Sequence, residues 1–391
     1  MNTYHILILL SSLVIFSYLF DLFAKKTRFP SILLLLITGV SIKAISVEFN
    51  FHIINFSTIL PVLGNIGLIL IVLEGALELK YTRDKLPLIR KSLGASLIPM
   101  LLTMAAVSYL FLYLFSTDLH TALLNSIPFA VISSAIAIPS AAGLVTDKKE
   151  FIIYESSFSD IFGIIIFNYV FVNTVFTLRS FAGLAIETMI ILLVSLICCL
   201  AILFLIGRIT HHIKYYLLFA VMILVYAIGK SFHLSSLIVI LAVGIFLSNT
   251  SWFRFAWFKN FFAYEGLKED IHNLSSFAGE SAFLIRTFFF LIFGYTLNLS
   301  ELLDSEVFLI GLSILSVIYL IRFVYLKWVT KITIHPEVFI SPRGLISILL
   351  FYSIPAEQWC SPKENGLVLT VIIGTSLVMT IGLLTIYKKS E

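Results

Sequence analysis

The sequence predicts an all-α polytopic membrane protein of about thirteen transmembrane helices. Of its 391 residues, 60% are hydrophobic and only 12% are charged, and the mean hydropathy is +1.05. These values lie far outside the range of soluble globular domains. A membrane-spanning helix needs about 20 apolar residues, and charged, Pro or Asn-rich points divide the chain into segments of that kind. Lipid is therefore the expected solvent of this fold.

The apolar segments give the order of the expected spans. One of them is short, and only a brief polar stretch separates the eighth from the ninth, so twelve is the alternative count. The thirteen expected spans are residues 5–24, 31–47, 59–79, 88–115, 120–145, 152–178, 182–207, 215–231, 233–249, 277–297, 305–330, 338–355 and 366–387.

The basic residues predict the orientation of the chain. With the N-terminus outside and the C-terminus cytoplasmic, the inner loops contain most of the Lys and Arg residues, as the positive-inside rule requires. The net charge of +4 follows from this asymmetry, so no nucleic-acid partner is indicated. The compact form suggests a bacterial inner (plasma) membrane protein. No cleaved signal peptide is expected, because the first apolar segment is a full span long and lacks a basic n-region. The outer loops then contain only Lys43, Arg179, Lys230 and Lys363.

Several other classes of protein are not indicated. Cys198, Cys199 and Cys360 form no disulfide or metal-binding pattern. The sequence contains no His-Glu-x-x-His, no Gly-x-Ser-x-Gly and no intramembrane histidine pair, so no enzyme is expected. Neither a cofactor nor a nucleotide-binding domain is expected. The largest inner segment, Trp252 to Ser275, mixes aromatic and basic residues and predicts an interfacial amphipathic helix.

Asp160 is the strongest candidate for a functional residue. It lies within the sixth expected span, and apolar sequence continues beyond it. A carboxylate at membrane depth is costly and is a functional-site hypothesis by default. On a helix, Ser156 and Gly163 share the face of Asp160, so a hydroxyl and bare backbone lie beside the acid. This arrangement suggests a pocket for a small cation or a proton.

Two prolines and two further charged residues extend this interpretation. Pro139 in the fifth span and Pro342 in the twelfth each remove a backbone donor and free a carbonyl. Interruptions at corresponding places in two halves of a transporter point to a binding site at the membrane midplane. Arg343 cannot lose its proton, so it needs a carboxylate, a carbonyl or water. Glu74 is a further acid, in the third span.

Several stretches resemble the electroneutral sodium/proton exchangers, a branch of the monovalent cation/proton antiporters. Residues 155–160, Glu-Ser-Ser-Phe-Ser-Asp, match the Glu-Ser-x-x-Asn-Asp of the family's sixth helix, with Ser159 in place of Asn. Residues 343–347 match its Arg-Gly motif, residues 74–79 its Glu-Gly-x-Leu-Glu-Leu-like stretch, and residues 287–294 its Phe-rich tenth helix. The matches follow the family's order along essentially the whole chain.

The resemblance implies inverted repeats with two broken, crossing helices in a single transmembrane transporter domain. A core bundle, at about 88–178 and 305–387, would hold the ion site. A scaffold bundle, at about 1–79 and 215–297, would form a homodimer in the lipid bilayer. Residues at about 182–207 would form a linker helix.

The resemblance also assigns roles to individual residues. Asp160 would bind a monovalent cation and a proton alternately, with Glu155, Ser156 and Ser159 beside it and with Asp160 and Ser156 as cation ligands. The residues that would support the site are Arg343, Glu74, Arg322, Pro139, Ser133 and Ser134.

The fifth helix departs from the family pattern. The family has Thr-Asp-Pro where this chain has Ala-Ile-Pro at residues 137–139, so a hydroxyl and an acid are absent. Ser133, Ser134 and Ser140 are the nearby residues that would supply an oxygen instead. The main alternative function is therefore a relative without transport activity that acts as a sensor or scaffold, ahead of a channel.

Competition for one carboxylate predicts the mechanism. If an empty, charged site is too costly to move across the barrier, only the loaded forms cross and exchange becomes obligatory. Na⁺ or Li⁺ suits oxygen ligands in a small site, and a K⁺/H⁺ antiporter with a roomier site is the alternative. Because Ser159 replaces a possible second acid, electroneutral exchange is the simpler stoichiometry.

Each residue assignment has a structural alternative. Asp160 could be the buried ion-pair partner of Arg343. Glu155 could be a solvated acid at the rim, and Glu74 could stabilise helix contacts near the inner face. The serine hydroxyls could donate to carbonyls of their own helices.

Overall fold

The computed structural model is a bundle of α-helices, and the residues it describes contain no strand. This result confirms the predicted fold class. The described residues are 3–27, 31–48, 59–79, 83–141, 143–174, 178–208, 214–231, 236–250, 266–297, 299–302, 304–330, 335–361 and 363–387.

Each expected span corresponds to a helix or to a pair of helices. The helices in the first half of the chain are α1 (Thr3–Thr27), α2 (Ser31–Glu48), α3 (Ile59–Glu78), α4 (Leu86–Phe115), α5 (Leu119–Ala130), α6 (Ser134–Ser140), α7 (Thr146–Val172) and α8 (Leu178–Arg208). Those in the second half are α9 (Lys214–Ser231), α10 (Ser236–Ser248), α12 (Leu267–Thr296), α13 (Leu299–Leu302), α14 (Ser305–Tyr325), α15 (Leu345–Tyr352) and α16 (Glu364–Tyr387).

The segment around α12 differs from the prediction. The helix begins at Leu267 rather than near residue 277, so residues 267–275 belong to it and not to a separate interfacial helix. Residues 251–265, where the rest of that interfacial helix was expected, lie outside the described residues. The early start has a local reason, because Glu269 and Asp270 place negative charge in the first turn of α12, where the helix dipole favours it.

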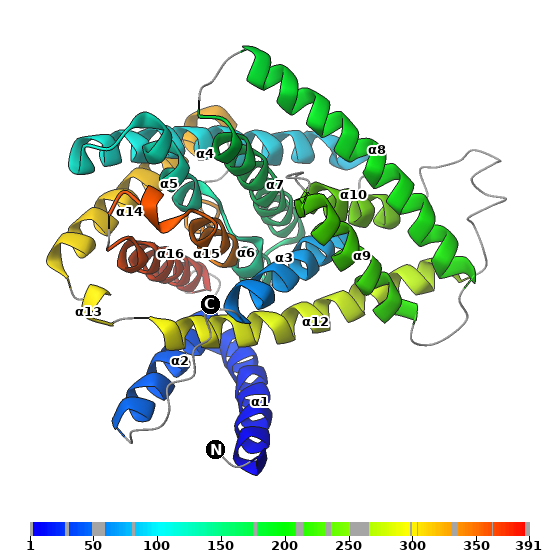
Figure 1. Cartoon of the computed structure of the whole chain (residues 1–391), viewed down its shortest axis with the longest axis horizontal. Coiled ribbons are helices and arrows are strands. Elements are labelled where there is room, and N and C mark those ends of the chain that lie inside the picture. Colours follow the sequence, from blue (N-terminus) through cyan, green and yellow to red (C-terminus); the bar gives the residue numbers. More distant parts are fainter. Residues whose placement is uncertain are drawn as a thin grey trace.

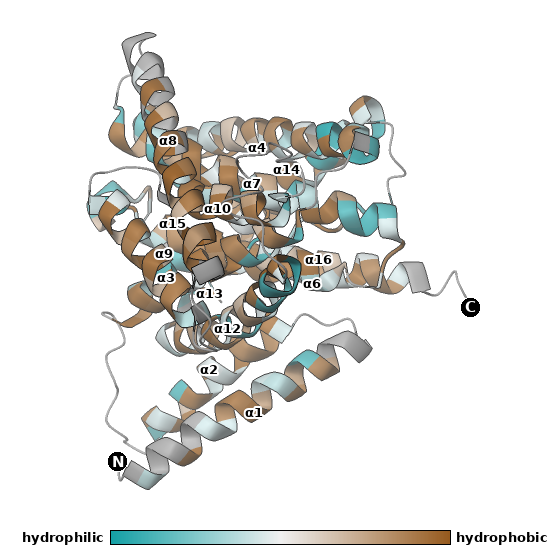
Figure 2. Cartoon of the chain, turned by 90° about the vertical axis from the view of Figure 1, so that its right-hand side faces the viewer, coloured by the Kyte–Doolittle hydropathy of each residue, from teal (hydrophilic) through white to brown (hydrophobic). Residues whose placement is uncertain are grey.

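The outer surface of the bundle is apolar. Seven stretches of the described residues are long and apolar enough to cross a membrane, and four shorter apolar helices accompany them. Large side chains such as Tyr109, Met189 and Leu309 are exposed on their helices, and hydrophobic colour covers most of the ribbon in Figure 2. A surface of this kind is stable in hydrocarbon and not in water.

The helices pack in two groups (Figure 1). In one group, α12 packs along α2 and α3, and α10 packs against α3, α8 and α9. In the other, α4 packs against α5, α7 and α14, and α14 packs against α16. The two groups contact each other where α3 packs against α6, α7 and α15 and where α10 packs against α7.

Backbones in the first group approach very closely. A Cβ atom added at Gly39 of α2 would lie 2.1 Å from the Leu291 carbonyl oxygen, and one at Gly294 of α12 would lie 2.4 Å from the Leu36 carbonyl oxygen. Small residues that allow such contact drive helix association in membranes. The α2–α12 pair is therefore a tight, rigid unit.

Two helices are broken and their breaks cross. Residues 131–133 separate α5 from α6, and residues 340–344 precede α15 without helical structure. The backbone N–H of Ser133 donates to the carbonyl of Pro342 at 2.8 Å, so the two segments touch. Non-helical backbone at membrane depth is tolerated only where protein buries it, and residues 131–133 are buried.

The position of the first break corrects the prediction. Pro342 lies in a break as expected, but Pro139 lies near the end of α6 rather than at the interruption. The break comes at Val131, Ile132 and Ser133, a stretch without Pro or Gly. It is stabilised by hydrogen bonds from other parts of the fold, which local sequence does not reveal.

Candidate functional site

Asp160 is buried on α7 next to the first break. Its side chain is 3% exposed, and its Oδ2 atom accepts a hydrogen bond from the hydroxyl of Ser134, the first residue of α6. Its Oδ1 atom is buried without a hydrogen-bond partner among the described residues. A buried carboxylate oxygen in this state is costly unless a ligand or a proton satisfies it.

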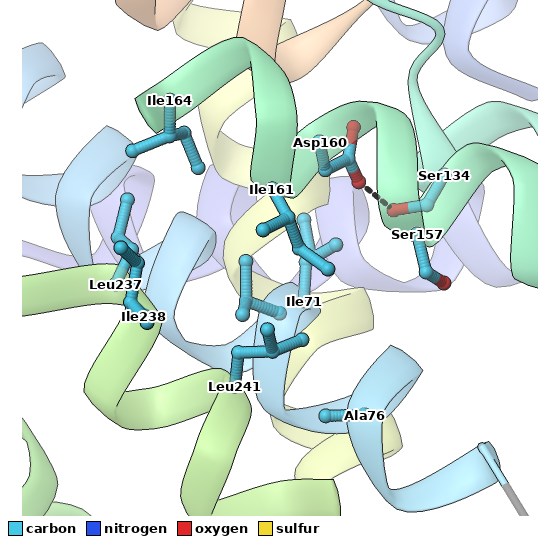
Figure 3. A pocket seen from close by; sticks show the side chains of 11 residues that line it. Ile71, Ala76, Ser134, Ser157, Asp160, Ile161, Ile164, Leu237, Ile238 and Leu241 are labelled. Carbon is cyan, nitrogen blue, oxygen red and sulfur yellow. Dashed lines mark hydrogen bonds between the residues drawn. The ribbon is translucent and has the colours of Figure 1, made fainter. Parts of the chain in front are cut away.

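A small cavity lies against this carboxylate (Figure 3). Its volume is about 20 Å³, which is room for about one water-sized particle. Asp160, Ser134 and Ser157 are its polar lining residues, and α3 and α10 close it with apolar side chains. The Ser157 hydroxyl also has no hydrogen-bond partner in the described structure. Asp160 and Ser157 thus line the same small space, and each has an oxygen without a hydrogen-bond partner among the described residues.

Ser157, which sequence reasoning missed, lines this cavity, and Ser156 does not. The Ser156 hydroxyl donates to the Ile152 carbonyl at 2.8 Å, so it is satisfied within its own helix. Both serines are within one turn of Asp160, at i−3 and i−4, and both spacings place a side chain near the acid. The i−3 spacing was the available signal, but only the direction of the neighbouring helices decides between the two residues.

Ser159 and Ser133 support the break rather than line the cavity. The Ser159 hydroxyl accepts the backbone N–H of Ile132 at 2.9 Å, which satisfies a donor that the broken helix leaves free. Ser133 contacts the other break through its backbone, and its hydroxyl has no partner among the described residues. A Cβ added at Gly163 would lie 2.3 Å from Val131, so α7 packs flush against this break.

Glu155 is fully engaged in an ion pair, five residues before Asp160. Its side chain is 1% exposed and Arg322 of α14 is 2% exposed. Arg322 donates to both carboxylate oxygens, at 2.7 and 2.8 Å, and also to the carbonyls of Glu337 and Ile340. A bidentate Arg–carboxylate pair with satisfied hydrogen bonds is the form in which a buried charge pair is stable. Glu155 is therefore not a solvated rim acid, and no hydrogen bond in the described part of the chain joins it to Asp160.

Arg343 is held by carbonyls and not by a carboxylate. Its side chain donates to Phe129 at 2.7 Å, to Ala130 at 3.2 Å and to Ser341 at 2.7 Å. Phe129 and Ala130 are the last residues of α5, where the carbonyls have no helical partner and a cation is favourable. The alternative of a structural Asp160–Arg343 pair is thus wrong in this structure.

Pro139 acts on the site from a distance. It has no N–H, so the carbonyl of Ala135 one turn earlier lacks its helical donor. Arg286 of α12 donates to that carbonyl at 2.9 Å. The proline therefore ties α6 to α12, across the boundary between the two groups of helices.

Glu74 lies on α3 against α12. A Cβ added at Gly279 would lie 3.2 Å from its carboxylate oxygen, and its side chain is half-buried. It is not among the residues that line the cavity at Asp160.

A second, larger cavity adjoins the first. Its volume is about 300 Å³, and Ile164 and Leu237 line both cavities. Its polar lining residues are Asn65, Asn168, Tyr226, Lys230 and Ser353. The Tyr226 hydroxyl donates to Asn65 at 2.9 Å, which fixes part of this wall.

The described residues contain no group of three or more His, Cys, Asp or Glu side chains that could hold a resident metal ion. An all-helical membrane fold with two crossing, broken helices and one incompletely bonded carboxylate beside them is the architecture of a secondary active transporter.

The comparisons with known proteins agree with this class. The family model for sodium/hydrogen exchangers, transmembrane, matches residues 10–389, so the chain belongs to this family. It is a membrane-embedded cation/proton antiporter and not an enzyme, as the sequence resemblance indicated. No curated protein sequence matches the chain.

Solved structures confirm the fold. The chain is similar to the sodium proton antiporter MjNhaP1 from Methanocaldococcus jannaschii at pH 8, with a TM-score of 0.72, 20% identity, and coverage of 97% of this chain and 99% of that one. An electron-microscopy structure of the same antiporter gives a TM-score of 0.68 at 20% identity, covering 98% of this chain and 96% of that one.

Proposed function

We propose that Asp160 is the single site at which a monovalent cation and a proton compete during exchange. The observation that carries the proposal is the state of its carboxylate. One oxygen accepts from Ser134, the other is buried without a partner among the described residues, and Asp160 lines a cavity of about 20 Å³. Either a proton or a cation would satisfy that oxygen, and the cavity holds only one small particle at a time.

The cation would be Na⁺. Hard alkali cations bind oxygen ligands, and Asp160, Ser134 and Ser157 supply a carboxylate and two hydroxyls. A cavity with room for about one water suits the smaller dehydrated ions Na⁺ and Li⁺ better than K⁺. Ser134 and Ser157 would take the place of the hydroxyl and acid that residues 137–139 lack, and Ser156 has no part in this ligand set.

The exchange would be electroneutral. Glu155 is neutralised by Arg322 and does not line the cavity. Asp160 would therefore be the acid that exchanges a proton for a cation. Without a proton or a cation, Asp160 would be an unpaired negative charge in a low-dielectric environment. The free-energy cost of that charge would prevent the empty site from moving across the membrane barrier. One cation then exchanges for one proton.

Two bundles would move against each other. Helices α4 to α7 with α14 to α16 would form the core, while α1 to α3 with α9, α10 and α12 would form the scaffold and the homodimer contact, with α8 as the linker. The packing supports this division, since α12 contacts α2 and α3 heavily and α3 and α10 make most of the contacts between the groups. The N-terminus would face the outside, in a bacterial inner membrane.

The test measures fluorescence dequenching of a pH-sensitive dye when a cation is added to acid-loaded proteoliposomes. Na⁺ and Li⁺, added separately, are expected to drive proton efflux from wild type, K⁺ much less, and none from Asp160→Asn. Ser156→Ala is the matched control and should retain the wild-type rate. Folded wild type that exchanges no cation would establish the alternative of a relative without transport. Equal flux in Asp160→Asn would remove Asp160 from the site.

A further inference from the structure

Lys230 has an unusual place in the fold. The positive-inside pattern predicts an outer loop for it, but it is the second-to-last residue of α9 and lines the cavity of about 300 Å³. Among the described residues that line this cavity, Lys230 alone carries a formal charge, since the other polar ones are Asn, Tyr and Ser. The described residues offer it no hydrogen bond or ion pair.

The cavity that contains Lys230 is next to the ion site. Ile164 of α7 and Leu237 of α10 line both this cavity and the small one at Asp160, so two side chains lie between them. A space of about 300 Å³ with five polar residues in its wall has room for several water molecules. The Lys230 side chain, which is exposed, therefore borders a hydrated space that adjoins the cavity at Asp160.

A fixed positive charge in such a space acts on any cation that enters it. In a partly hydrated protein cavity, a unit charge on the order of 10 Å away changes the local concentration of a monovalent ion by about two- to tenfold. Lysine is free of a neutralising carboxylate here, so its field is not cancelled within the described wall.

We infer that this cavity is the vestibule by which one face of the membrane reaches Asp160, and that Lys230 is a specificity-determining residue that lowers the apparent affinity for cations on that face. The inference rests on the proposed function of Asp160. Lys230 alters how readily a cation enters or leaves, and it leaves the equilibrium of the exchange unchanged. With the N-terminus outside, the vestibule faces outward, and the ammonium opposes re-entry of a cation that has left.

The transport test is a charge series at Lys230, measured from both faces. Right-side-out and everted membrane vesicles present opposite faces to added Na⁺. For the vestibule face, Lys230→Arg should leave the KM for Na⁺ unchanged. Lys230→Gln should lower this KM, and Lys230→Glu should lower it further, to a total decrease of about two- to tenfold. The maximal rate and the KM from the other face should stay within about twofold. A flat series, or one in which Arg behaves like Glu, overturns the inference while the role of Asp160 stands.

A second test needs no transport. In a background with Cys198→Ser, Cys199→Ser and Cys360→Ser, a cysteine at Ser353 in the vestibule wall is labelled with cationic and anionic methanethiosulfonate reagents that do not cross membranes. Lys230→Gln should raise the ratio of cationic to anionic labelling rates by about two- to tenfold. The matched control is Leu119→Cys, an exposed residue at the start of α5 that does not line the vestibule, where the ratio should not respond to Lys230→Gln. An unlabelled Ser353→Cys, or a ratio unchanged by Lys230→Gln, contradicts the vestibule and the role of Lys230 whether or not the protein transports ions.

Discussion

Two carboxylates on the same helix are buried to nearly the same degree but have very different hydrogen-bond partners. Glu155 is 1% exposed and Asp160 is 3% exposed, and they are five residues apart on α7. Glu155 receives two hydrogen bonds from one guanidinium, at 2.7 and 2.8 Å. Asp160 accepts from the Ser134 hydroxyl, and its Oδ1 atom has no hydrogen-bond partner among the described residues.

The difference separates structure from function. A buried charge whose hydrogen-bonding capacity is filled stabilises one arrangement of helices and has no capacity left for a ligand. A buried charge left half satisfied is unfavourable by itself, and its cost is relieved only when a ligand arrives. Burial therefore does not identify the ion site of this protein, whereas incomplete bonding does.

The largest expected effect concerns Asp160. Asp160→Asn keeps the shape of the side chain and removes its charge, so cation-driven proton flux in proteoliposomes should fall to background. Because the lost charge was poorly paired, the free energy of unfolding should change by less than about 1 kcal/mol. A large loss of thermal stability in detergent would mean that Asp160 is a structural residue like Glu155.

Glu155 should show the opposite profile. Glu155→Gln leaves Arg322 buried without its counter-charge, and breaking a buried pair in this way costs about 3–5 kcal/mol. Thermal unfolding followed by tryptophan fluorescence measures the loss. The double variant Glu155→Leu with Arg322→Met removes both charges and should be more stable than Glu155→Gln alone. If the double variant is the least stable, the pair is not the source of the effect.

Arg286 should have a smaller effect on stability. Arg286→Met leaves the Ala135 carbonyl without a donor, because Pro139 cannot supply one, and an unsatisfied buried acceptor costs about 1–3 kcal/mol. Arg286→Lys can still donate and serves as the control. The prediction fails if both variants unfold at the wild-type temperature.

The smallest effect distinguishes two adjacent hydroxyls. Ser157→Ala removes an oxygen that lines the cavity and should raise the KM for Na⁺ by about fivefold, the equivalent of one hydrogen bond of about 1 kcal/mol. Ser156→Ala removes a hydroxyl that bonds only to its own helix and should leave KM unchanged. The reverse pattern would restore Ser156 as the ligand and would contradict the position of the cavity.

Much of the fold could be predicted from local properties of the sequence. Apolar length predicts the order of the spans, and most of their helices begin and end close to the predicted limits. The exceptions are α12, which begins ten residues early, α7, which is shifted by six residues, and α15, which begins seven residues late. Asp160 could be identified because a charged residue far inside an apolar segment is costly and is usually functional. Pro342 was identifiable as part of a break because proline removes a donor.

The rest depends on contacts between distant residues. The break at residues 131–133 has no proline or glycine, and its free groups are satisfied by Ser159, Arg343 and the carbonyl of Pro342. The pairing of Glu155 with Arg322 joins residues 167 positions apart. Helical spacing does not distinguish Ser157 from Ser156. Only the packing of α3 and α10 shows that the cavity lies beside Ser157. Local periodicity contains none of this information.

The central claim is that a cation and a proton compete for Asp160, and the most direct test is proton release on cation binding. Calorimetric titration of the purified protein with Na⁺, in two buffers of different ionisation enthalpy, counts the protons exchanged. The account predicts release of about one proton per Na⁺ bound at a pH where the site is protonated, and no Na⁺ binding in Asp160→Asn. Na⁺ binding to wild type without proton release, or equal proton release from Asp160→Asn, would contradict it.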